Sequence, residues 1–253
     1  MGRLNGKRVL VTGATQGIGK AIAEDLIKNG CDVAIHSFRQ GPGTDDIKAL
    51  AQENNRRAEC FQGDLTQENE VIECVDKAVS FLDGLDILIN NSGALVERRS
   101  VEEIDLQHWR KVIDVNLTTM MLVTRQAVPH LVETGASSIV NLSSLAGRKG
   151  GHPGSLVYAS TKGAVITWTR ALAMELAPDG IRVNTVAPGL ILNTSFHETH
   201  STKDSIGATI ASIPLGRAGN PEDVARAVTF LAAEYDGFIT GETIDINGGV
   251  YCA

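Results

Sequence analysis

The stretch that decides the fold is Val11-Thr12-Gly13-Ala14-Thr15-Gln16-Gly17-Ile18-Gly19, which follows the apolar run Arg8–Thr12 and opens a segment of helical period. Glycines at such a junction let the backbone turn tightly and approach a pyrophosphate, whose charge is favoured by a helix N-terminus. The spacing differs from G-x-G-x-x-G because three residues separate the first two glycines. The stretch predicts a dinucleotide-binding strand–turn–helix unit, with helix–strand packing as the alternative reason for the glycines.

Short apolar runs alternate with longer segments of helical period along the chain. The strand-like runs are Arg8–Thr12, Asp32–Ser37, Ala58–Gln62, Leu85–Asn90, Ser138–Ser143, Ile181–Ala187 and Glu242–Ile246, and the helix-like segments are 17–29, 44–55, 67–82, 102–133, 157–177 and 221–234. Strands that are apolar throughout and separated by helices indicate a parallel sheet covered on both faces. We predict an α/β fold, a single doubly wound Rossmann domain over 1–253 with a seven-stranded parallel sheet and helices on both faces.

One interval, 190–217, follows the sixth strand-like run and contains no further strand. Long segments after the carboxyl end of a strand more often have a function than serve as plain connections. We expect 190–217 to form a substrate lid within the single domain.

Charge and hydropathy exclude several classes of protein. The formal net charge is −7, and the basic residues are scattered, so no stripe exists for a nucleic-acid backbone. No apolar stretch reaches the roughly eighteen residues of a membrane span, and the N-terminus has no apolar signal region. The four cysteines, Cys31, Cys60, Cys74 and Cys252, form no C-x-x-C pair. These features predict a cytoplasmic protein that binds neither nucleic acid nor membrane.

Tyr158 and Lys162 stand four residues apart in V-Y-A-S-T-K-G, within a helix-like segment. Positions i and i+4 share one helix face, and an ammonium beside a phenol favours the phenolate. A tyrosine with such a neighbour exchanges a proton near neutral pH more readily than an ordinary phenol, whose pKa is about 10. Alone, the pair is also compatible with a surface tyrosine above a solvated lysine. Its position fourteen residues after Ser144, and downstream of the glycine-rich turn, favours chemistry.

Several motifs together resemble the short-chain dehydrogenase/reductase family over essentially the whole chain. They are T-G-A-T-Q-G-I-G, N-N-S-G (Asn90–Gly93), V-N-L (Val115–Leu117), N-L-S-S (Asn141–Ser144), Y-A-S-T-K, A-P-G (Ala187–Gly189), P-L-G-R-A-G-N-P-E-D-V-A and G-E-T-I-D-I-N-G-G. As a set they are specific for the family and say little about the substrate.

The resemblance implies a catalytic set of Ser144, Tyr158, Lys162 and Asn116. Ser144 is expected to bind the substrate carbonyl, Tyr158 to act as general acid/base, and Lys162 to lower the pKa of the phenol and hold the nicotinamide ribose. Asn116 is expected to interrupt its helix and anchor a water near Lys162. Ser143 competes with Ser144, and its alternative role is a hydrogen bond at the end of the strand. Asn90 is expected to bridge adjacent strands.

The resemblance also implies a nicotinamide cofactor. The residues expected to contact it are Gly13, Thr15, Gln16, Gly17, Ile18, Gly19, Ser37, Arg39, Asp64, Leu65, Asn91, Tyr158, Lys162, Pro188, Gly189, Ile191 and Asn193. For the carboxamide contact, the neighbouring Thr194 is the alternative to Asn193. Asp64 is equally compatible with a helix N-cap.

The choice between NADP and NAD depends on the end of the second strand, His36-Ser37-Phe38-Arg39. No carboxylate stands there to hold a ribose 2′-hydroxyl, whereas Arg39 can pair with a 2′-phosphate and Ser37 can donate a hydrogen bond. Asp32 lies about twenty residues after the glycines but begins the strand instead of ending it. Gln16 stands where relatives that prefer the phosphate often carry a second cation, which favours NAD. We expect NADP, with NAD as the alternative.

Three functions compete. The first is an oxidoreductase that transfers a hydride between the cofactor and a ketone or secondary alcohol of a small molecule. The second is a 3-oxoacyl-acyl-carrier-protein reductase, which the acidic chain and the absence of cations at 133–136 and Asp179 disfavour. The third is a non-catalytic NAD(P)-binding regulatory protein, against which the intact catalytic set argues. The pair His197 and His200 suggests metal only weakly, so we predict no metal.

We expect a homotetramer. In 157–177, the residues Val165, Ile166, Trp168, Leu172 and Met174 surround more of the helix than the roughly 100° that a core-facing stripe needs. The C-terminal G-G-V-Y-C-A is also apolar. Closed two-fold pairings of such surfaces give D₂ symmetry, and scattered apolar residues on the surface of a monomer are the alternative.

Overall fold

The computed structural model describes residues 4–39, 41, 43–194, 203–233 and 237–253. Its centre is a seven-stranded sheet in the order β3-β2-β1-β4-β5-β6-β7, in which every neighbouring pair is parallel. The order reverses between β1 and β4, which places a crevice at the carboxyl ends of these two strands. The predicted parallel α/β fold is therefore confirmed.

The strands are β1 (Arg8–Val11), β2 (Asp32–Ser37), β3 (Ala58–Gln62), β4 (Ile87–Asn90), β5 (Ser137–Leu142), β6 (Ile181–Pro188) and β7 (Thr243–Ile246). The α-helices are α1 (Gly17–Lys28), α2 (Gly43–Glu53), α3 (Glu68–Leu82), α4 (Leu106–Ile113), α5 (Thr119–Val132), α6 (Leu145–Lys149), α7 (Leu156–Leu176), α9 (Lys203–Ala211) and α10 (Pro221–Ala232). A π-helical turn covers Asp114–Thr118, and a 3₁₀ turn covers Ala177–Asp179.

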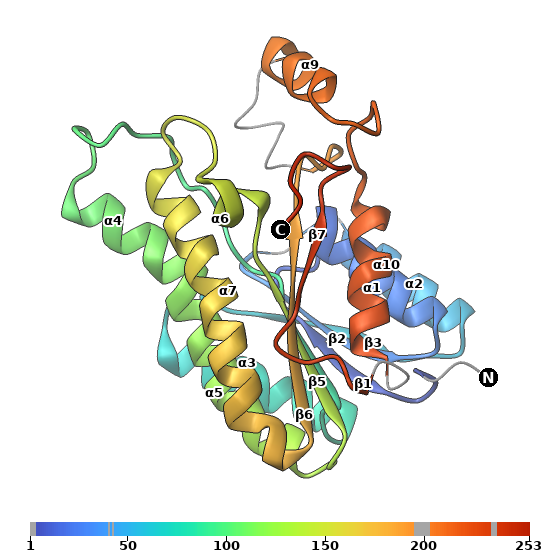
Figure 1. The fold of residues 1–253 in the computed structure, drawn as a ribbon. Helices are drawn as coiled ribbons and strands as arrows, with labels where there is room; N and C mark the ends of the chain where they lie inside the picture. The colour runs from blue at the N-terminus through green and yellow to red at the C-terminus, as the bar shows by residue number, and fades with distance from the viewer. Residues whose placement is uncertain (1–3, 40, 42, 195–202, 234–236) are drawn as a thin grey trace.

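Two apolar cores lie on opposite faces of the sheet. Side chains alternate along each strand, so Val9 and Val11 of β1 pack with α1, α2 and α10, whereas Leu10 packs with α3, α5 and α7. Figure 1 shows these two helix layers on either side of the sheet, with α9 beyond the edge where the strands end. Double coverage explains why the strands are apolar throughout.

The helix predicted over 102–133 is interrupted. The Asn116 side chain donates hydrogen bonds to the carbonyls of Val112, at 2.9 Å, and Ala94, at 2.8 Å, which replace regular bonding in the π-helical turn. This interruption was expected at Asn116. The short helices α6 and α9 were not predicted as helices, and α9 lies inside 190–217.

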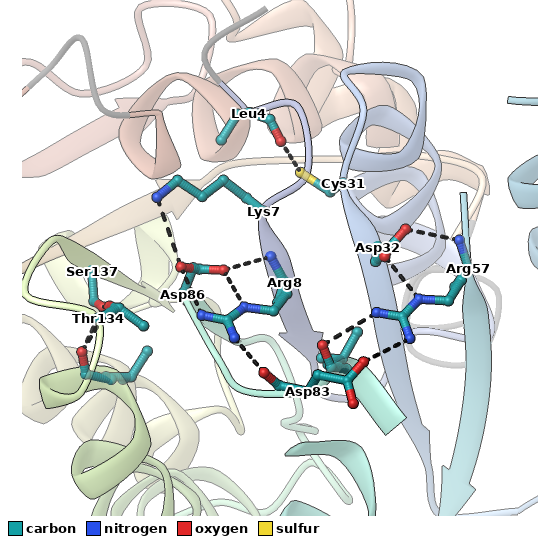
Figure 2. Close-up of polar contacts among 12 residues, drawn as sticks. Leu4, Lys7, Arg8, Cys31, Asp32, Arg57, Asp83, Asp86, Thr134 and Ser137 are labelled. Carbon is teal, nitrogen blue, oxygen red and sulfur yellow. Dashed lines mark hydrogen bonds and ion pairs between the residues drawn. The ribbon is translucent and has the colours of Figure 1, made fainter. Parts of the chain in front are cut away.

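Ion pairs join the amino ends of four strands, at the edge opposite the crevice (Figure 2). The carboxylate of Asp86, just before β4, accepts hydrogen bonds from the backbone and side chain of Arg8 at 2.9 and 2.7 Å. Arg57, just before β3, bonds Asp32 at 2.9 Å and Asp83 at 3.1 Å. Asp32 begins β2, as the sequence predicted, and therefore lies at the end of the strand away from the cavity. Its ion pair with Arg57 was not predicted.

Among the residues with described placement, no helix is both long and apolar enough to cross a membrane. The cysteines Cys31, Cys60, Cys74 and Cys252 are all free thiols.

Candidate functional site

The carboxyl ends of the adjacent strands β1, β4, β5 and β6 meet at one cavity of about 890 Å³. At one end it is lined by the glycine-rich turn, and at the other by α6, α7 and α9. Its lining includes Gly13, Gln16, Gly17, Ile18, Gly19, Asn91, Gly93, Arg98, Ser144, Lys149, Tyr158, Lys162, Pro188, Gly189, Ile191, Thr194, Ile206 and Ile213. Most of the residues predicted from the sequence are therefore brought together.

The glycines of the turn have different roles. A Cβ on Gly19 would lie 2.3 Å from the Gly13 carbonyl oxygen, so this glycine allows α1 to pack directly on the turn. Gly17, with φ +53°, lines the cavity, and the nearest atoms to a Cβ added there would be those of Thr194, at 3.5 Å or more. Helix packing explains Gly19, and the left-handed backbone explains Gly17, whose missing side chain also leaves the cavity wall open there.

Asn91 holds the turn against β4. Its Nδ2 donates to the carbonyls of Thr12 and Gly13, both at 2.9 Å, and the Thr12 hydroxyl accepts from the amides of Asn91 and Ser92 at 3.0 Å. Asn91 therefore positions the glycine-rich turn as well as lining the cavity.

His36 was not predicted as a functional residue, yet it secures the same turn from β2. Its buried Nδ1 accepts a hydrogen bond from the Gly13 amide at 3.3 Å, and its Nε2 lies 2.9 Å from the Gly63 carbonyl. Burial lowers the pKa of His36, against the opposing effects of Gly63 and Asp64, so the ring is neutral with its proton on Nε2. The sequence signal was a lone histidine among apolar residues of a strand.

Ser143 and Ser144 face different neighbours. The buried Ser143 hydroxyl donates to the Lys162 carbonyl at 2.6 Å, the strand-end bond that was its alternative role. Ser144 is the N-cap of α6, accepting from the Ala146 amide at 3.1 Å, and its hydroxyl is hydrogen-bonded to Tyr158. The geometry supports Ser144 as the serine that faces a reacting group.

Lys162 and Asn116 lie beside Gly93. A Cβ on Gly93 would come within 3.0 Å of the Lys162 Nζ and 2.7 Å of the Asn116 Oδ1. The Lys162 ammonium donates to the Leu142 carbonyl at 2.8 Å and stands 5.7 Å from the centre of the Tyr158 ring. Only a glycine leaves room for these two side chains to converge.

The pKa of Tyr158 differs from the expectation that Lys162 would lower it. Burial raises the pKa of Tyr158 to about 12, and the Ser144 hydrogen bond acts in the opposite direction. The ammonium lies over the ring, and burial lowers the pKa of Lys162 to about 8. The i, i+4 spacing predicted the shared face correctly but not the depth of burial, which favours both neutral forms.

The three residues expected to contact the adenosine part of the cofactor, Ser37, Arg39 and Asp64, are not among those that line the cavity. The Ser37 hydroxyl is buried and lies 3.4 Å from the Cys60 sulfur, so it does not face solvent at the end of β2. Arg39 is exposed, with its guanidinium 5.3 Å from the Phe38 ring centre. Asp64 accepts from both the amide and the hydroxyl of Thr66 in the turn before α3, whose N-cap is Gln67, so the capping alternative for Asp64 is wrong.

Two more residues that were expected to contact the cofactor, Thr15 and Leu65, do not line the cavity. Thr15 packs against Gly41, and Leu65 belongs to the core on the α3 face.

At the nicotinamide end, Thr194 lines the cavity and Asn193 does not. Asn193 has a left-handed backbone, φ 58°, and an exposed side chain, whereas Thr194 is buried and donates to the Ile191 carbonyl at 3.1 Å. The structure therefore favours the alternative for the carboxamide contact. His197 and His200 lie outside the described residues, and within the described part of the chain no three His, Cys, Asp or Glu side chains cluster as metal ligands.

Asn90 bridges two strands, as predicted. Its Nδ2 donates to Asn141 on β5 at 2.9 Å and to Thr124 on α5 at 3.0 Å.

A nicotinamide dinucleotide fits this cavity. A glycine-lined turn and the N-terminus of α1 suit a pyrophosphate, and the described lining contains no carboxylate to repel it. The cavity continues from there to Tyr158 and Lys162, so a cofactor held on the turn reaches the titratable side chains. The fold and site define a nicotinamide-dependent oxidoreductase.

Comparison with known proteins gives the same class of protein. The chain matches the family model described as enoyl-(acyl carrier protein) reductase over residues 13–251. It is 38% identical to the 3-oxoacyl-acyl-carrier-protein reductase FabG of Aquifex aeolicus, covering 98% of this chain and 99% of the relative. It is 32% identical to glucose 1-dehydrogenase 2 of Bacillus subtilis, covering 98% and 95%.

Among solved structures, the chain resembles the NADH-dependent reductase A1-R′ responsible for alginate metabolism. The TM-score is 0.90 at 33% identity, with 99% of each chain covered, and the complex of that reductase with NAD gives 0.87. The protein belongs to the short-chain dehydrogenase/reductase family and is an NAD(P)-dependent oxidoreductase.

His36→Phe is expected to weaken binding of the nicotinamide cofactor about tenfold, because the Gly13 amide and the Gly63 carbonyl lose their partner. Titration of cofactor fluorescence measures this, with His130→Phe on α5 as a control that leaves affinity unchanged. Affinity for His36→Phe within twofold of the wild type would contradict the positioning role.

The stability difference between wild type and His36→Phe is also expected to depend on pH. Folding with a neutral His36 costs more once the unfolded histidine is protonated, so the wild type loses relative stability as pH falls below about 6.5. Urea unfolding at pH 5.5 and 7.5 measures the difference.

Proposed function

We propose that this protein reduces a ketone, or oxidises the corresponding secondary alcohol, of a small molecule. One observation carries the proposal: Ser144, Tyr158 and Lys162 line the end of the cavity whose other end is the glycine-rich turn. When bound, the nicotinamide cofactor supplies or accepts the hydride. Catalytic roles for these side chains follow from their contacts.

In the reducing direction, the Ser144 hydroxyl hydrogen-bonds the substrate carbonyl oxygen, and Tyr158 gives that oxygen its proton. A phenol with a pKa of about 12 is protonated at neutral pH, as a general acid must be. Lys162 holds the nicotinamide ribose. Its ammonium also stabilises the negative charge that Tyr158 acquires when it gives up its proton, because the two then form an ion pair. Asn116, beside Lys162 at Gly93, anchors a water through which the proton returns from solvent.

Reduction of 3-oxoacyl groups on acyl carrier protein is the second candidate. The similarity to the 3-oxoacyl-acyl-carrier-protein reductase of Aquifex aeolicus supports it, and the matching family model is described by another reaction on acyl carrier protein. Against it, 133–136 and Asp179 carry no cation for an acidic carrier, and they lie together before β5 and β6, where Gly180 meets Gly135. The third candidate, a non-catalytic regulatory protein, is separated from both by turnover of the purified protein.

For the cofactor, we propose NADP, with NAD as the alternative. Arg39 is an exposed cation just after β2, and no carboxylate lies between His36 and Arg39. The buried Ser37 hydroxyl adds no support, so the proposal depends on Arg39.

We propose that 190–217 covers the substrate within a single domain, because Ile206, Thr209 and Ile213 line the cavity beside Tyr158. We also propose a cytoplasmic location, which the four free thiols support. Cell fractionation tests the location.

We propose a homotetramer on revised grounds. Three of the residues that suggested it, Val165, Ile166 and Leu172, are buried within the chain. However, exposed residues recur along α7 at intervals of three or four, and an uncharged strip of them runs beside the exposed Arg170 and Glu175: Leu156, Ser160, Ala164, Thr167, Ala171 and Met174. Met174 is 82% exposed and Leu156 51%. An uncharged strip of this length suits pairing with a second copy.

Tyr158→Phe is expected to lower kcat about 10²–10⁴-fold and to leave cofactor affinity within about twofold, because only the proton donor is removed. Ser144→Ala is expected to lower kcat as well, whereas Ser143→Ala keeps it within a few-fold, since Ser143 bonds only backbone. Steady-state kinetics with NADPH and NADH measure all three. A fully active Tyr158→Phe, or equal losses for both serines, would refute the assignments.

Arg39→Ala is expected to weaken NADPH binding about tenfold and NADH binding less than about twofold, through loss of the guanidinium–phosphate contact. Lys28→Ala, an exposed cation at the far end of α1, is the control and changes neither. Equal losses for both cofactors would contradict the proposed preference.

Light scattering at micromolar concentration is expected to give four times the mass of one chain. Ala171→Arg, which places a charge in the middle of the exposed α7 face, is expected to yield smaller species. A wild-type mass near that of one chain would refute the assembly.

A further inference from the structure

We propose that Arg148 is a positioning residue for Ser144. By pairing with Asp245 of β7, it fixes α6, the short helix that Ser144 caps, and so directs the Ser144 hydroxyl toward the reacting carbonyl. The inference rests on the proposed function and adds to it a residue that lies outside the described cavity lining. Arg148 therefore acts on the reaction only through the side chains that it holds.

The direction of the Ser144 hydroxyl depends on the first turn of α6. Ser144 leaves β5 with an extended backbone, and its hydroxyl accepts a hydrogen bond from the Ala146 amide at 3.1 Å. Its carbonyl accepts from the Gly147 amide at 2.9 Å. The same hydroxyl is hydrogen-bonded to Tyr158. A movement of α6 would carry the Ala146 amide with it and turn the Ser144 hydroxyl away from Tyr158.

Helix α6 depends on tertiary contacts for its place. It has five residues, and a helix this short is not stable in water by itself. It packs on α7 backbone against backbone, because a Cβ on Gly147 would lie 2.5 Å from the carbonyl carbon of Lys162 and 2.7 Å from the amide nitrogen of Gly163. This contact prevents α6 from moving toward α7, and a second attachment is needed to keep it from moving away.

Arg148 supplies the second attachment. Its Nε donates to the Asp245 carboxylate at 3.1 Å, and its Nη2 donates to the Thr243 carbonyl at 3.3 Å. The rigid fork of a guanidinium suits two acceptors at once and so fixes an orientation as well as a distance. The side chains of Arg148 and Asp245 are only 11% and 17% exposed, so water and salt screen the pair little. Helix α6 is thereby joined to β7 in one orientation.

The last residues of the chain connect this attachment to the cavity. Asn247, just after β7, donates to the Tyr251 carbonyl at 3.0 Å and accepts from the Gly249 amide at 2.9 Å, which folds the segment back on itself. The Tyr251 ring centre then lies 5.9 Å from the Arg148 guanidinium, and Val250 lines the cavity. Arg148 thus holds Ser144 from one side and contacts the segment that forms part of the cavity wall.

The first test compares Arg148→Gln in two backgrounds. The purified protein is assayed with ethyl 3-oxobutanoate, 4-oxopentanoate and dihydroxyacetone, using NADPH and NADH, and the fastest pair is kept. We expect Arg148→Gln to lower kcat about tenfold in the wild type but less than about twofold when Ser144 is already alanine, because no hydroxyl is then left to position. Cofactor affinity is expected to stay within about twofold, since the glycine-rich turn is unchanged.

Arg57→Gln is the matched control. It removes the ion pairs with Asp32 and Asp83 at the opposite edge of the sheet, so it affects stability without reaching Ser144. We expect it to change kcat less than about twofold in both backgrounds. An equal loss from Arg148→Gln with and without the Ser144 hydroxyl would overturn the proposal, because Arg148 would then serve stability alone.

Hydrogen exchange tests the attachment without any substrate. In Arg148→Gln, the amides of 144–150 are expected to exchange at least about tenfold faster, while those of α1 stay within about twofold of the wild type. Arg148→Lys, which keeps a charge beside Asp245, is expected to give an intermediate rate. Where Arg148→Gln does not fold, Arg148→Lys and Asp245→Asn take its place in both tests, with losses in the same direction.

The two tests separate this inference from the proposed function. A wild type that reduces none of the three ketones refutes the proposed reaction for them, whereas faster exchange confined to 144–150 still supports the attachment. Unchanged exchange in 144–150, or exchange that is faster by the same factor throughout the chain, overturns the inference whatever the protein reduces.

Discussion

The structure depends on backbone packed against backbone at the start of α1. A Cβ on Gly19 would lie 2.3 Å from the Gly13 carbonyl oxygen and 2.5 Å from the Asn91 Nδ2, so any other residue would displace the helix or the turn. Asn91 holds this turn from β4, and His36 holds it from β2. Because α1 then begins at the switch point of the sheet, its N-terminus and the cavity coincide.

At the other end of the cavity, two ionisable side chains, Tyr158 and Lys162, are buried at a cost in stability. Burial lowers the pKa of Lys162 from 10.5 to about 8, which corresponds to a cost of about 3 kcal/mol for keeping it charged at neutral pH. The same burial keeps Tyr158 protonated. Buried groups with strongly shifted pKa values are typical of active sites, where function outweighs the local optimum of stability.

The two edges of the sheet use charge differently. At the amino edge, Arg8 and Arg57 are neutralised by Asp86, Asp32 and Asp83 (Figure 2). Burial alone would raise the pKa of Asp86, but the Arg8 hydrogen bonds outweigh it and lower that pKa. At the carboxyl edge, the described cavity lining holds cations without carboxylates. At the amino edge, the paired charges connect neighbouring strands.

The sequence by itself determined the features that depend on local pattern. The bounds of β2 and β3 were predicted to the residue. In β2, the apolar run Val33–Ile35 lies between the polar residues Asp32 and His36. The shared face of Tyr158 and Lys162 followed from helical period, and the role of the turn followed from its glycines. The family motifs likewise predicted catalytic roles for Ser144 and Asn116, which stay predictions.

Only the tertiary structure decided how deeply those residues are buried and what they touch. The π-helical turn depends on Asn116 reaching Ala94, twenty-two residues away. The left-handed backbone at Asn193 turns Thr194, not Asn193, toward the cavity, and the Ser37 hydroxyl faces Cys60 across strands. Spacing could not give the sign of the Tyr158 pKa shift, because desolvation comes from segments distant in the chain.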